Sequence, residues 1–290
     1  MKDQHSLMPE LPEVQTVVTQ LGRKIVGKIF SGFWSDWERK VSPSSTELEC
    51  GIRGAAVLGA RRFGKHIVID LDNRYSLVIH LKMTGHLLHK TEENRESRAF
   101  TEDRYNGYIH HIFSFADGST LEFSDLRKFG WIMLVETIEV ERLPSIAVLG
   151  IDALSSRLTA TVFAELVRKR ECRMIGEILL DQSLIAGIGN IYRSEALFLS
   201  GVRPYRPGKE LGASETEKLI KAIRRVLRQA SRLGGMSDGD FRDTNGLSGR
   251  FEKNLFVYGR TGQPCKKCDT IIHRIKIGQR SAFFCPSCQE

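Results

Sequence analysis

The chain has 290 residues, 41% hydrophobic and 27% charged, which is typical of a soluble globular protein with one large or two smaller domains. The formal net charge of +8 favours a polyanionic partner, although many basic proteins bind no nucleic acid. The apolar runs are short, and residues 1–7 have no apolar core, so neither a transmembrane helix nor a secretory signal is indicated.

The segment 8–14 reads Met-Pro-Glu-Leu-Pro-Glu-Val and looks like a translation start. If the chain began at Met8 and this Met were removed, Pro9 would carry a free amine with a pKa of about 8, beside Glu10 and Glu13. Such an amine attacks a sugar carbon and gives a cationic iminium. With residues 1–7 attached, the Pro9 nitrogen is an amide, and we expect that the start codon is misassigned.

Short β-type runs follow one amphipathic helix near the N-terminus. Pro12 fits the first turn of that helix, and Val14, Val17, Val18 and Leu21 form one apolar face. Predicted strands cover residues 28–33, 66–71, 76–81, 110–115, 120–124 and 131–135, with hairpin turns at 72–74 and 116–118. This pattern predicts an antiparallel sandwich or barrel, and the polar stretch 90–108 predicts a mobile surface loop.

The pattern turns helical from about Ser155, with predicted helices at 161–168, 174–181, 190–199 and 215–233. The last helix has an apolar stripe and a basic stripe, and the basic stripe by itself is more typical of a solvated face. That basic stripe comprises Lys218, Lys221, Arg225, Arg228 and Arg232. Residues 231–250 are rich in Gly, Asp and Ser, which predicts a long flexible loop.

Four of the six cysteines form two CxxC pairs near the C-terminus, namely Cys265, Cys268, Cys285 and Cys288. This spacing predicts a tetrahedral Zn²⁺ site, which is structural because four thiolates leave no open coordination position. The residues between the pairs predict a β-hairpin that presents Arg274, Lys276 and Arg280 to phosphates. Cys50 and Cys172 are interpreted as core thiols.

Two further features are weaker taken alone. The Gly-rich segment 180–192 predicts a tight turn before a helix, with Asn190 as a candidate N-cap near which N–H groups bind phosphate; a plain helix–helix turn is the alternative. Lys65, at the start of an apolar strand, is an ordinary surface residue unless Pro9 is a nucleophile that needs a general acid nearby.

With these pieces in order, the chain resembles the formamidopyrimidine-DNA glycosylases, a superfamily that includes endonuclease VIII, from Met8 to the C-terminus. The matching blocks are MPELPEV, GKHIVIDL, HLKMTG, DLRKFG, LLDQSLIAGIGNIYRSEALF, VYGRTGQPC and QRSAFFCPSC. The resemblance implies an α+β fold with an N-terminal antiparallel β-sandwich and flanking helices (8–140), a helix–two-turn–helix bundle (155–250) and a four-Cys zinc finger (255–290). A DNA-binding cleft would lie between the domains.

The resemblance also implies roles for individual residues. Pro9 resembles the Schiff-base nucleophile, Glu10 the acid that assists base loss and ribose opening, and Glu13 the second active-site carboxylate. Lys65 resembles the general acid of β-elimination, and Arg280 the residue assigned to δ-elimination and phosphate binding. Residues that resemble DNA contacts are Met83, Arg127 and Phe129, which fill the gap left by the extruded base, and Asn190, which binds phosphate. Without the family, Met83 and Phe129 would be interpreted as strand-end core residues.

Three positions depart from the family pattern. Residues 1–7 extend the N-terminus, and Gly176 stands near an expected Lys. Tyr108 stands where relatives often carry a DNA-contacting His, and His110 is the candidate substitute.

The resemblance implies a monomeric base-excision-repair enzyme of the bacterial cytoplasm, associated with the nucleoid. It would bind damaged double-stranded DNA and remove oxidised purines, 8-oxoguanine and formamidopyrimidines, by glycosylase and AP lyase steps with β,δ-elimination. Zn²⁺ is the one expected cofactor, and no membrane partner is expected. The alternatives are an oxidised-pyrimidine glycosylase of the same superfamily and a non-catalytic DNA-binding relative.

Overall fold

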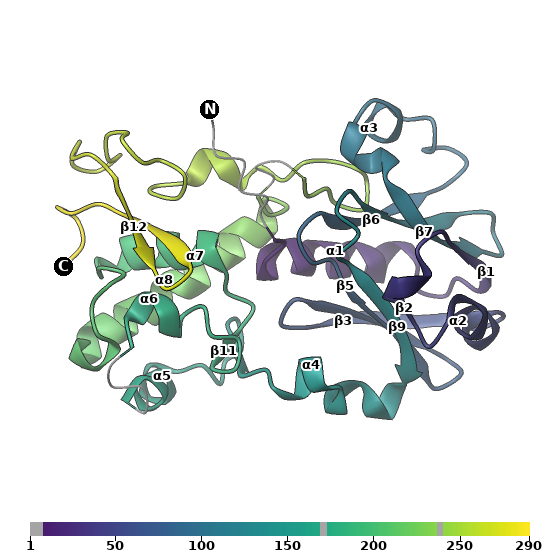
Figure 1. Ribbon diagram of the computed structural model, residues 1–290, viewed down its shortest axis with the longest axis horizontal. Coiled ribbons are helices and arrows are strands. Elements are labelled where there is room, and N and C mark those ends of the chain that lie inside the picture. Colours follow the sequence, from purple (N-terminus) through teal and green to yellow (C-terminus); the bar gives the residue numbers. More distant parts are fainter. Residues whose placement is uncertain (1–7, 169–172, 237–239) are drawn as a thin grey trace. The chain divides into compact units, whose positions relative to one another are not determined.

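The computed structural model describes residues 8–168, 173–236 and 240–290 (Figure 1). The chain divides into two compact units, Met1–Ala147 with Ala230–Glu252, and Val148–Gln229 with Lys253–Glu290. Residues 230–250, which were expected in the helix–two-turn–helix bundle, thus group with the N-terminal unit. Cys172 and residues 1–7 lie outside the described residues.

The N-terminal unit contains two β-sheets. The four-stranded sheet has the order β1 (Phe30–Ser35), β7 (Ile109–Phe115), β8 (Thr120–Asp125), β6 (Gly85–Lys90). The five-stranded sheet has the order β2 (Val41–Ser42), β9 (Trp131–Glu136), β5 (Tyr75–His80), β4 (His66–Leu71), β3 (Val57–Phe63). Only the β2–β9 pairing is parallel among the described strands of these sheets, so the expected antiparallel sandwich is confirmed.

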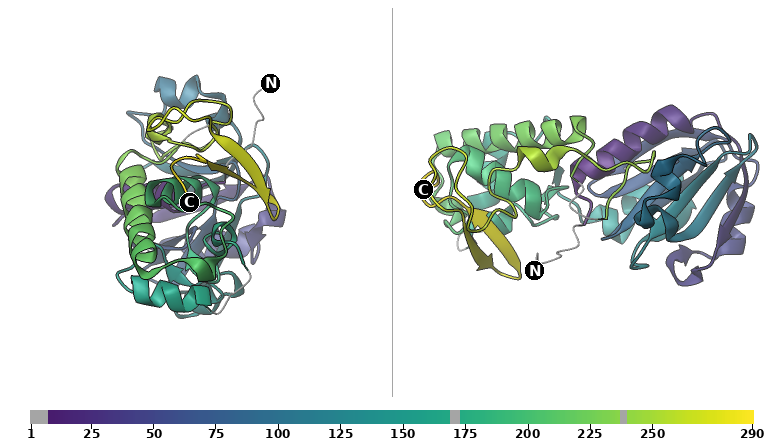
Figure 2. Two further views of the ribbon diagram at one scale, coloured as in Figure 1. Left: turned by 90° about the vertical axis from the view of Figure 1, so that its left-hand side faces the viewer. Right: turned by 90° about the horizontal axis from the view of Figure 1, so that it is seen from above.

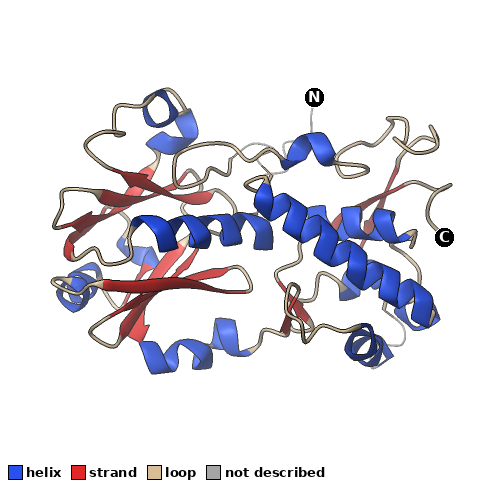
Figure 3. Ribbon diagram, turned by 180° about the vertical axis from the view of Figure 1, so that it is seen from behind, coloured by secondary structure: helices blue, strands red, loops and turns tan. Residues whose placement is uncertain are grey.

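One apolar core joins both sheets to α1 (Leu11–Lys24) and α2 (Ser45–Ile52). Figure 3 shows the two sheets of this unit in red, with α1 running alongside them. The predicted apolar face of α1 is buried, since Val14, Val17 and Leu21 have no exposed surface. At about 25 cal/mol per Å² of buried apolar surface, this face is the main source of stability for the helix.

Several predictions for this unit were wrong. Strand β3 was missed because Gly59 and two arginines interrupt its apolar pattern. Strand β6 was missed because it begins at a glycine and buries two histidines, His86 and His89. The stretch 90–108 is not all loop, since it contains α3 (Arg98–Thr101) and a 3-10 turn at Arg104–Gly107. Cys50 is exposed, because α2 turns Leu48 and Ile52 inward instead. Outside the sheets lie α4 (Pro144–Ala147) and 3-10 turns at Glu38–Lys40 and Thr137–Arg142.

The second unit is mostly helical, with a short parallel pair of strands and a C-terminal hairpin. Its helices are α5 (Ala160–Arg168), α6 (Ile175–Ile178), α7 (Asn190–Ser200) and most of α8 (Ala213–Arg232), and it has a 3-10 turn at Gly208–Glu210. A further 3-10 turn, Phe251–Asn254, includes the last residues of the N-terminal unit and the first of the final segment. Its strands are β10 (Ile151–Asp152), β11 (Ile185–Ala186), β12 (His273–Ile277) and β13 (Arg280–Phe284). The β12–β13 hairpin, yellow in Figure 2, is the one predicted between the CxxC pairs. The basic stripe of α8 is exposed, as expected of a solvated face.

Candidate functional site

Two buried carboxylates, those of Glu10 and Glu13, lie at the start of α1. Pro9 is buried, Glu10 is the N-cap of α1, and Glu10 and Glu13 form a capping box. Both carboxylate oxygens of Glu13 accept hydrogen bonds from backbone N–H groups: Oε2 accepts from Glu10 at 2.8 Å and Oε1 accepts from Met236 at 2.7 Å. Glu13 therefore fixes the Pro9–Glu10 backbone against the 235–236 segment of the same unit, which is a positioning function.

Gly235 is required beside this carboxylate. Its φ is +79°, and a Cβ there would lie 2.6 Å from Glu13 Oε1. A side chain would therefore meet both backbone strain and a direct clash with the oxygen that accepts the Met236 N–H. The sequence showed only a Gly-Gly pair and gave no sign of its partner.

Lys65 stands at the tip of the β3–β4 hairpin. The two-residue turn is formed by Gly64, with a φ of +54°, and Lys65, as in a type II′ turn. Arg62 ties this tip to α1: its Nη1 donates to the Gly64 carbonyl at 2.8 Å and its Nε donates to Gln15 Oε1 at 3.0 Å. The hairpin tip that carries Lys65 is thereby held to α1, whose N-cap is Glu10, through an arginine that sequence reasoning missed.

Two neutral histidines lie next to this hairpin tip. The rings of His66 and His80 meet edge-on at 4.7 Å, and Trp131 packs against both. Burial lowers the pKa of His66 to about 4, and burial together with His66, Lys82 and Lys65 lowers the pKa of His80 to about 2. Neutral His80 accepts the Lys82 N–H on Nδ1 at 2.9 Å, which supports the turn before Met83.

The predicted gap-filling residues lie on two turns that one buried carboxylate joins. Asp125, 3% exposed, accepts from the Thr84 hydroxyl, from the Arg127 N–H at 3.2 Å and from the Gly130 N–H at 2.7 Å. Thr84 follows Met83, and its hydroxyl also accepts the Arg127 N–H at 3.0 Å. Asp125 and Thr84 thus bring Met83 together with the 126–130 turn, and neither was singled out from the sequence.

The side chains on these turns face solvent rather than the core. Phe129 is 43% exposed, Arg127 is exposed, and Met83 is half-buried. The Arg127 guanidinium lies 4.8 Å from the centre of the Phe129 ring, so the two form a cation–π pair. The strand-end core interpretation of Phe129 is therefore wrong, and an exposed aromatic ring paired with a cation is suited to contact with bases.

Tyr108 and His110 are placed differently. The Tyr108 carbonyl accepts the Asp125 N–H at 2.8 Å, which places this residue beside the 126–130 turn. The His110 ring instead contacts the Asp36 carboxylate through Nδ1, at 2.8 Å from Oδ1. Of the two alternatives, the structure brings Tyr108 to the gap-filling turns.

Segment 241–247, expected to be part of a flexible loop, is fixed to the N-terminal unit by polar contacts. Gln20 on α1 donates to Asp243 at 2.7 Å and accepts from the N–H and hydroxyl of Thr244 at 2.9 and 2.8 Å. Arg242 forms an ion pair with Asp103 at 2.6 Å. The end of this loop is therefore anchored on α1 and on the segment that follows α3.

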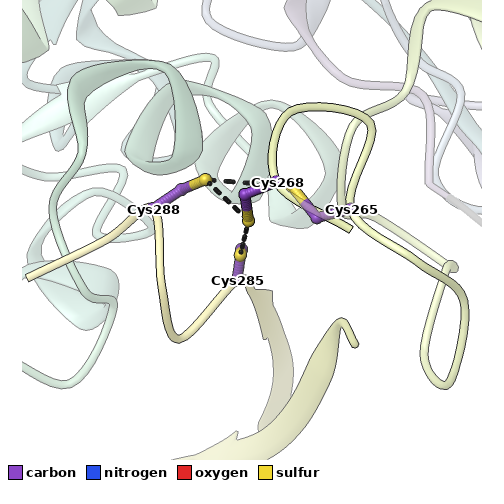
Figure 4. Close-up of side chains that lie close together, drawn as sticks. All are labelled: Cys265, Cys268, Cys285 and Cys288. Carbon is purple, nitrogen blue, oxygen red and sulfur yellow. Dashed lines mark hydrogen bonds between the residues drawn. The ribbon is translucent and has the colours of Figure 1, made fainter. Parts of the chain in front are cut away.

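The four cysteines of the two CxxC pairs converge, as the close-up in Figure 4 shows. Their Sγ atoms lie 3.9 Å (Cys265–Cys288), 3.5 Å (Cys268–Cys285) and 3.3 Å (Cys268–Cys288) apart. Four sulfurs at about 2.3 Å from a tetrahedral Zn²⁺ would be about 3.8 Å apart, so the donor set fits zinc with no open position.

Helix α7 anchors this finger through the buried side chains of Glu195 and Arg193. Glu195 accepts three successive N–H groups, from Phe256 at 2.8 Å, Val257 at 3.0 Å and Tyr258 at 2.8 Å. Arg193 donates to the Ser281 carbonyl on β13 at 2.7 Å. The finger that carries exposed Arg280 is thus fastened to the helix that begins at Asn190.

Two details in this unit correct or explain the sequence interpretation. Asn190 is the first residue of α7 and not its N-cap, which is Gly189. At Gly176 a Cβ would lie 2.7 Å from the Pro204 carbonyl oxygen, which accepts the Gly176 N–H at 2.9 Å. Glycine at position 176, where the family resemblance leads us to expect lysine, therefore allows the backbones of Gly176 and Pro204 to approach closely.

Comparisons with known proteins agree with this architecture. Three family models match: the formamidopyrimidine-DNA glycosylase N-terminal domain (residues 8–132), the formamidopyrimidine-DNA glycosylase H2TH domain (149–241) and the zinc finger found in FPG and IleRS (262–290). The formamidopyrimidine-DNA glycosylase of Chloroflexus aurantiacus is 38% identical over 97% of this chain and 98% of its own. That of Pelotomaculum thermopropionicum is 36% identical over 98% of this chain and 99% of its own.

A solved relative has the same fold over nearly its whole length. Lactococcus lactis Fpg, in complex with DNA containing an abasic site, is 30% identical, with a TM-score of 0.85 over 97% of this chain and 99% of its own. No helix of the described residues is both long and apolar enough to cross a membrane. The finger match and the cysteine geometry together indicate one structural zinc ion. The chain therefore belongs to the formamidopyrimidine-DNA glycosylase family and is a DNA glycosylase that acts on damaged DNA.

Proposed function

We propose that this chain excises oxidised purines, 8-oxoguanine and formamidopyrimidines, from duplex DNA as a glycosylase and AP lyase, in a form that begins at Pro9. One observation carries the proposal: Pro9 is buried directly before the Glu10–Glu13 capping box, and the family match begins one residue earlier, at Met8. A chain that begins at Pro9 has a secondary amine there, and its pKa of about 8 leaves part of it uncharged at neutral pH.

In the proposed reaction the Pro9 nitrogen bonds to C1′ and loses its proton to solvent, while the damaged base leaves with the electrons of the C1′–N bond and takes up one proton from solvent. Glu10 donates a proton to the ribose ring oxygen; the C1′–O bond breaks and an iminium forms. The iminium acidifies C2′–H, so loss of that proton expels the 3′-phosphate, with Lys65 as general acid. A second elimination, assisted by Arg280, expels the 5′-phosphate. Water then hydrolyses the iminium, which releases the unsaturated sugar aldehyde, restores the Pro9 amine and leaves a one-nucleotide gap with phosphate at both ends.

The gap-filling turns support recognition of an extruded base. Extrusion costs a few kcal/mol of unstacking. Met83 and the Arg127–Phe129 pair would enter the vacated space, where apolar surface and a guanidinium offset part of that cost. Tyr108 would contact the DNA beside them, while His110 is engaged by Asp36. Asn190 would bind a backbone phosphate.

Oxidised pyrimidines are a second candidate substrate class. Lactococcus lactis Fpg, 30% identical with a TM-score of 0.84, has been solved in complex with DNA containing an oxidised pyrimidine. The same nucleophile and carboxylates serve either base, because the covalent chemistry takes place at the sugar. Base preference therefore has to be measured with a panel of lesions.

Borohydride trapping tests the proposal directly. Two forms of the zinc-loaded protein, one beginning at Met1 and one at Pro9, are incubated with duplexes containing 8-oxoguanine opposite cytosine, an oxidised pyrimidine, or no lesion. We expect the Pro9 form to crosslink to the 8-oxoguanine duplex, with the adduct mapped to Pro9, and the Met1 form to give no adduct.

Three other results would change the conclusion. Stronger trapping on the pyrimidine duplex would replace the purine preference with the second candidate. An adduct at another residue would overturn the assignment of Pro9. Duplex binding by the Pro9 form without any strand nicking would identify the chain as a non-catalytic DNA-binding relative.

A further inference from the structure

Arg193 is a fully buried cation within the second compact unit. Its guanidinium donates to oxygens on three separate elements: the Gly176 carbonyl on α6 at 3.3 Å, the side-chain Oδ1 of Asn190 on α7 at 2.7 Å, and the Ser281 carbonyl on β13 at 2.7 Å. A guanidinium keeps its charge and can only donate, so burial is tolerated only where acceptors surround it.

The contact with Asn190 settles which way its amide is turned. The guanidinium offers only donors, so the amide atom that faces it has to be the oxygen. The NH₂ end of Asn190 is then turned away from Arg193 on a half-buried side chain at the first residue of α7. An amide N–H in this place is a donor for a DNA phosphate oxygen, whereas the opposite orientation would present an acceptor and repel it.

The contact with Ser281 fixes the neighbouring finger strand. Ser281 directly follows exposed Arg280 at the start of β13, and its carbonyl bond to Arg193 holds that strand against α7. The Ser281 hydroxyl also accepts from Arg274 Nε at 2.9 Å across the hairpin. One side chain therefore determines the position of two candidate phosphate donors that lie 90 residues apart in the chain.

We propose that Arg193 is a positioning residue that couples Asn190 to Arg280, so that both donate to the DNA backbone in one bound geometry. Arg193 itself touches no DNA in this account. The inference rests on the proposed phosphate contacts of Asn190 and Arg280, and it adds the residue on which both depend.

A double-mutant cycle tests the coupling. Kd is measured for a duplex with a non-cleavable abasic-site analogue, using the zinc-loaded chain that begins at Pro9. We expect Asn190→Ala to raise Kd roughly tenfold, the scale of a hydrogen bond to a charged group, and Arg193→Met to raise it further, because the Asn190 and Arg280 contacts both depend on Arg193. In the Arg193→Met background, Asn190→Ala should then raise Kd less than about threefold, because its amide is no longer oriented.

The salt dependence of DNA binding distinguishes a lost phosphate contact from a general loss of stability. Loss of one phosphate-binding cation lowers the slope of log K against log[salt] by about 0.9. We expect Arg280→Ala and Arg193→Met to lower this slope by similar amounts, although Arg193 is buried. An unchanged slope in Arg193→Met would overturn the link to Arg280.

Arg203→Met is the matched control. Arg203 also holds the finger through carbonyls, donating to Gln289 at 2.7 Å and to Pro286 at 3.0 Å, but it has neither Asn190 nor Ser281 as a partner in the described contacts. We expect its effect on Kd to be additive with that of Asn190→Ala. The same additivity in the Arg193 cycle would overturn the positioning role while leaving the phosphate contact of Asn190 intact.

If Arg193→Met fails to fold or to bind zinc, Asn190→Asp tests the contact between Arg193 and Asn190 instead. The carboxylate still accepts from Arg193, so the melting temperature should not fall, but it has no N–H to offer and Kd should rise at least as much as in Asn190→Ala. A lowered melting temperature would contradict the Arg193–Asn190 contact. An unchanged Kd for Asn190→Ala alone would overturn the phosphate contact itself, whereas trapping at Pro9 reports separately on the proposed function.

Discussion

Thr84 donates its side-chain hydroxyl to the buried carboxylate of Asp125, and this bond joins the turn that carries Met83 to the turn that carries Arg127 and Phe129. The same carboxylate accepts the N–H groups of Arg127 and Gly130. Of the proposed gap-filling side chains, Arg127 and Phe129 are exposed and Met83 is half-buried, and polar contacts beneath them set the shape of their turns. Their geometry depends on polar residues that themselves face the protein interior.

Asp125→Asn should slow excision of the damaged base and should also lower the free energy of unfolding. One carboxylate oxygen becomes an NH₂ that faces N–H or O–H donors, and an unsatisfied buried group costs about 1–3 kcal/mol. Because the loss falls on the gap-filling turns, we expect single-turnover excision of 8-oxoguanine to fall roughly tenfold or more. Asp70→Asn is the control, since Asp70 binds Arg61 and Ser76 within its own sheet. Equal effects of both variants on excision would contradict the assignment.

Gly235→Ala should disrupt the start of α1. The added Cβ would meet Glu13 Oε1, and φ is +79°. We expect the variant to lose about 1–3 kcal/mol of unfolding free energy and to trap DNA poorly at Pro9. Gly59→Ala serves as control, because no atom lies within 4 Å of its added Cβ. If Gly235→Ala trapped normally, the Glu13–Met236 contact would have no part in placing Pro9.

Removal of zinc should unfold the finger and abolish DNA binding. Zinc binding is coupled to folding of the finger, and without the metal the four cysteines take up protons and lose the bonds that hold the two CxxC turns together. We expect Cys268→Ser, or treatment with a strong chelator, to lower bound zinc from one equivalent and to weaken duplex binding at least a hundredfold. The exposed Cys50 offers the matched control Cys50→Ser, which should retain zinc and binding. Zinc content by atomic absorption and Kd by fluorescence anisotropy give both readouts.

Stability should fall as pH drops from about 6.5 towards 4. Burial lowers the pKa of His86 to about 4, so the ring stays neutral in the folded state, while the unfolded ring titrates near 6.5. Below pH 6.5 the unfolded state therefore binds the extra proton, and His86 alone should cost about 3 kcal/mol by pH 4. His86→Gln should be less stable at pH 7.5 but should lose less on acidification. Parallel pH profiles in urea unfolding would contradict this cause.

Gly176→Lys should fail to improve binding, although it restores the residue expected from the family resemblance. A Cβ at this position would lie 2.7 Å from the Pro204 carbonyl oxygen, so the backbone has to shift. We expect a drop in melting temperature of several degrees, from an overpacking cost of about 1–3 kcal/mol. Gly176→Ala distinguishes the steric effect from the effect of the added charge, because it introduces the Cβ clash without the lysine ammonium. Tighter binding by the lysine variant would show that the site accommodates a side chain.

The elements with strong local periodicity could be predicted from the sequence. The apolar face of α1, strand β4 and most of α7 were predicted to within about one residue, because each follows a local period that needs no knowledge of its partner. Helix α6 was overestimated, as only Ile175–Ile178 are helical before the Gly-rich turn. Strands β3 and β6 were missed since their burial comes from neighbouring strands and not from their own pattern.

By itself, the sequence determined the zinc ligands, the proline that precedes two carboxylates, and the order of blocks that marks the family, since each is a local spacing of reactive residue types. Tertiary structure alone decided which polar residues hold these groups in place. Gln20 meets Thr244, Arg62 meets Gln15, and Arg193 meets Ser281 across 88 residues. Such pairs leave no local signature, because a buried hydrogen bond requires only that donor and acceptor meet after folding, however far apart they lie in the chain.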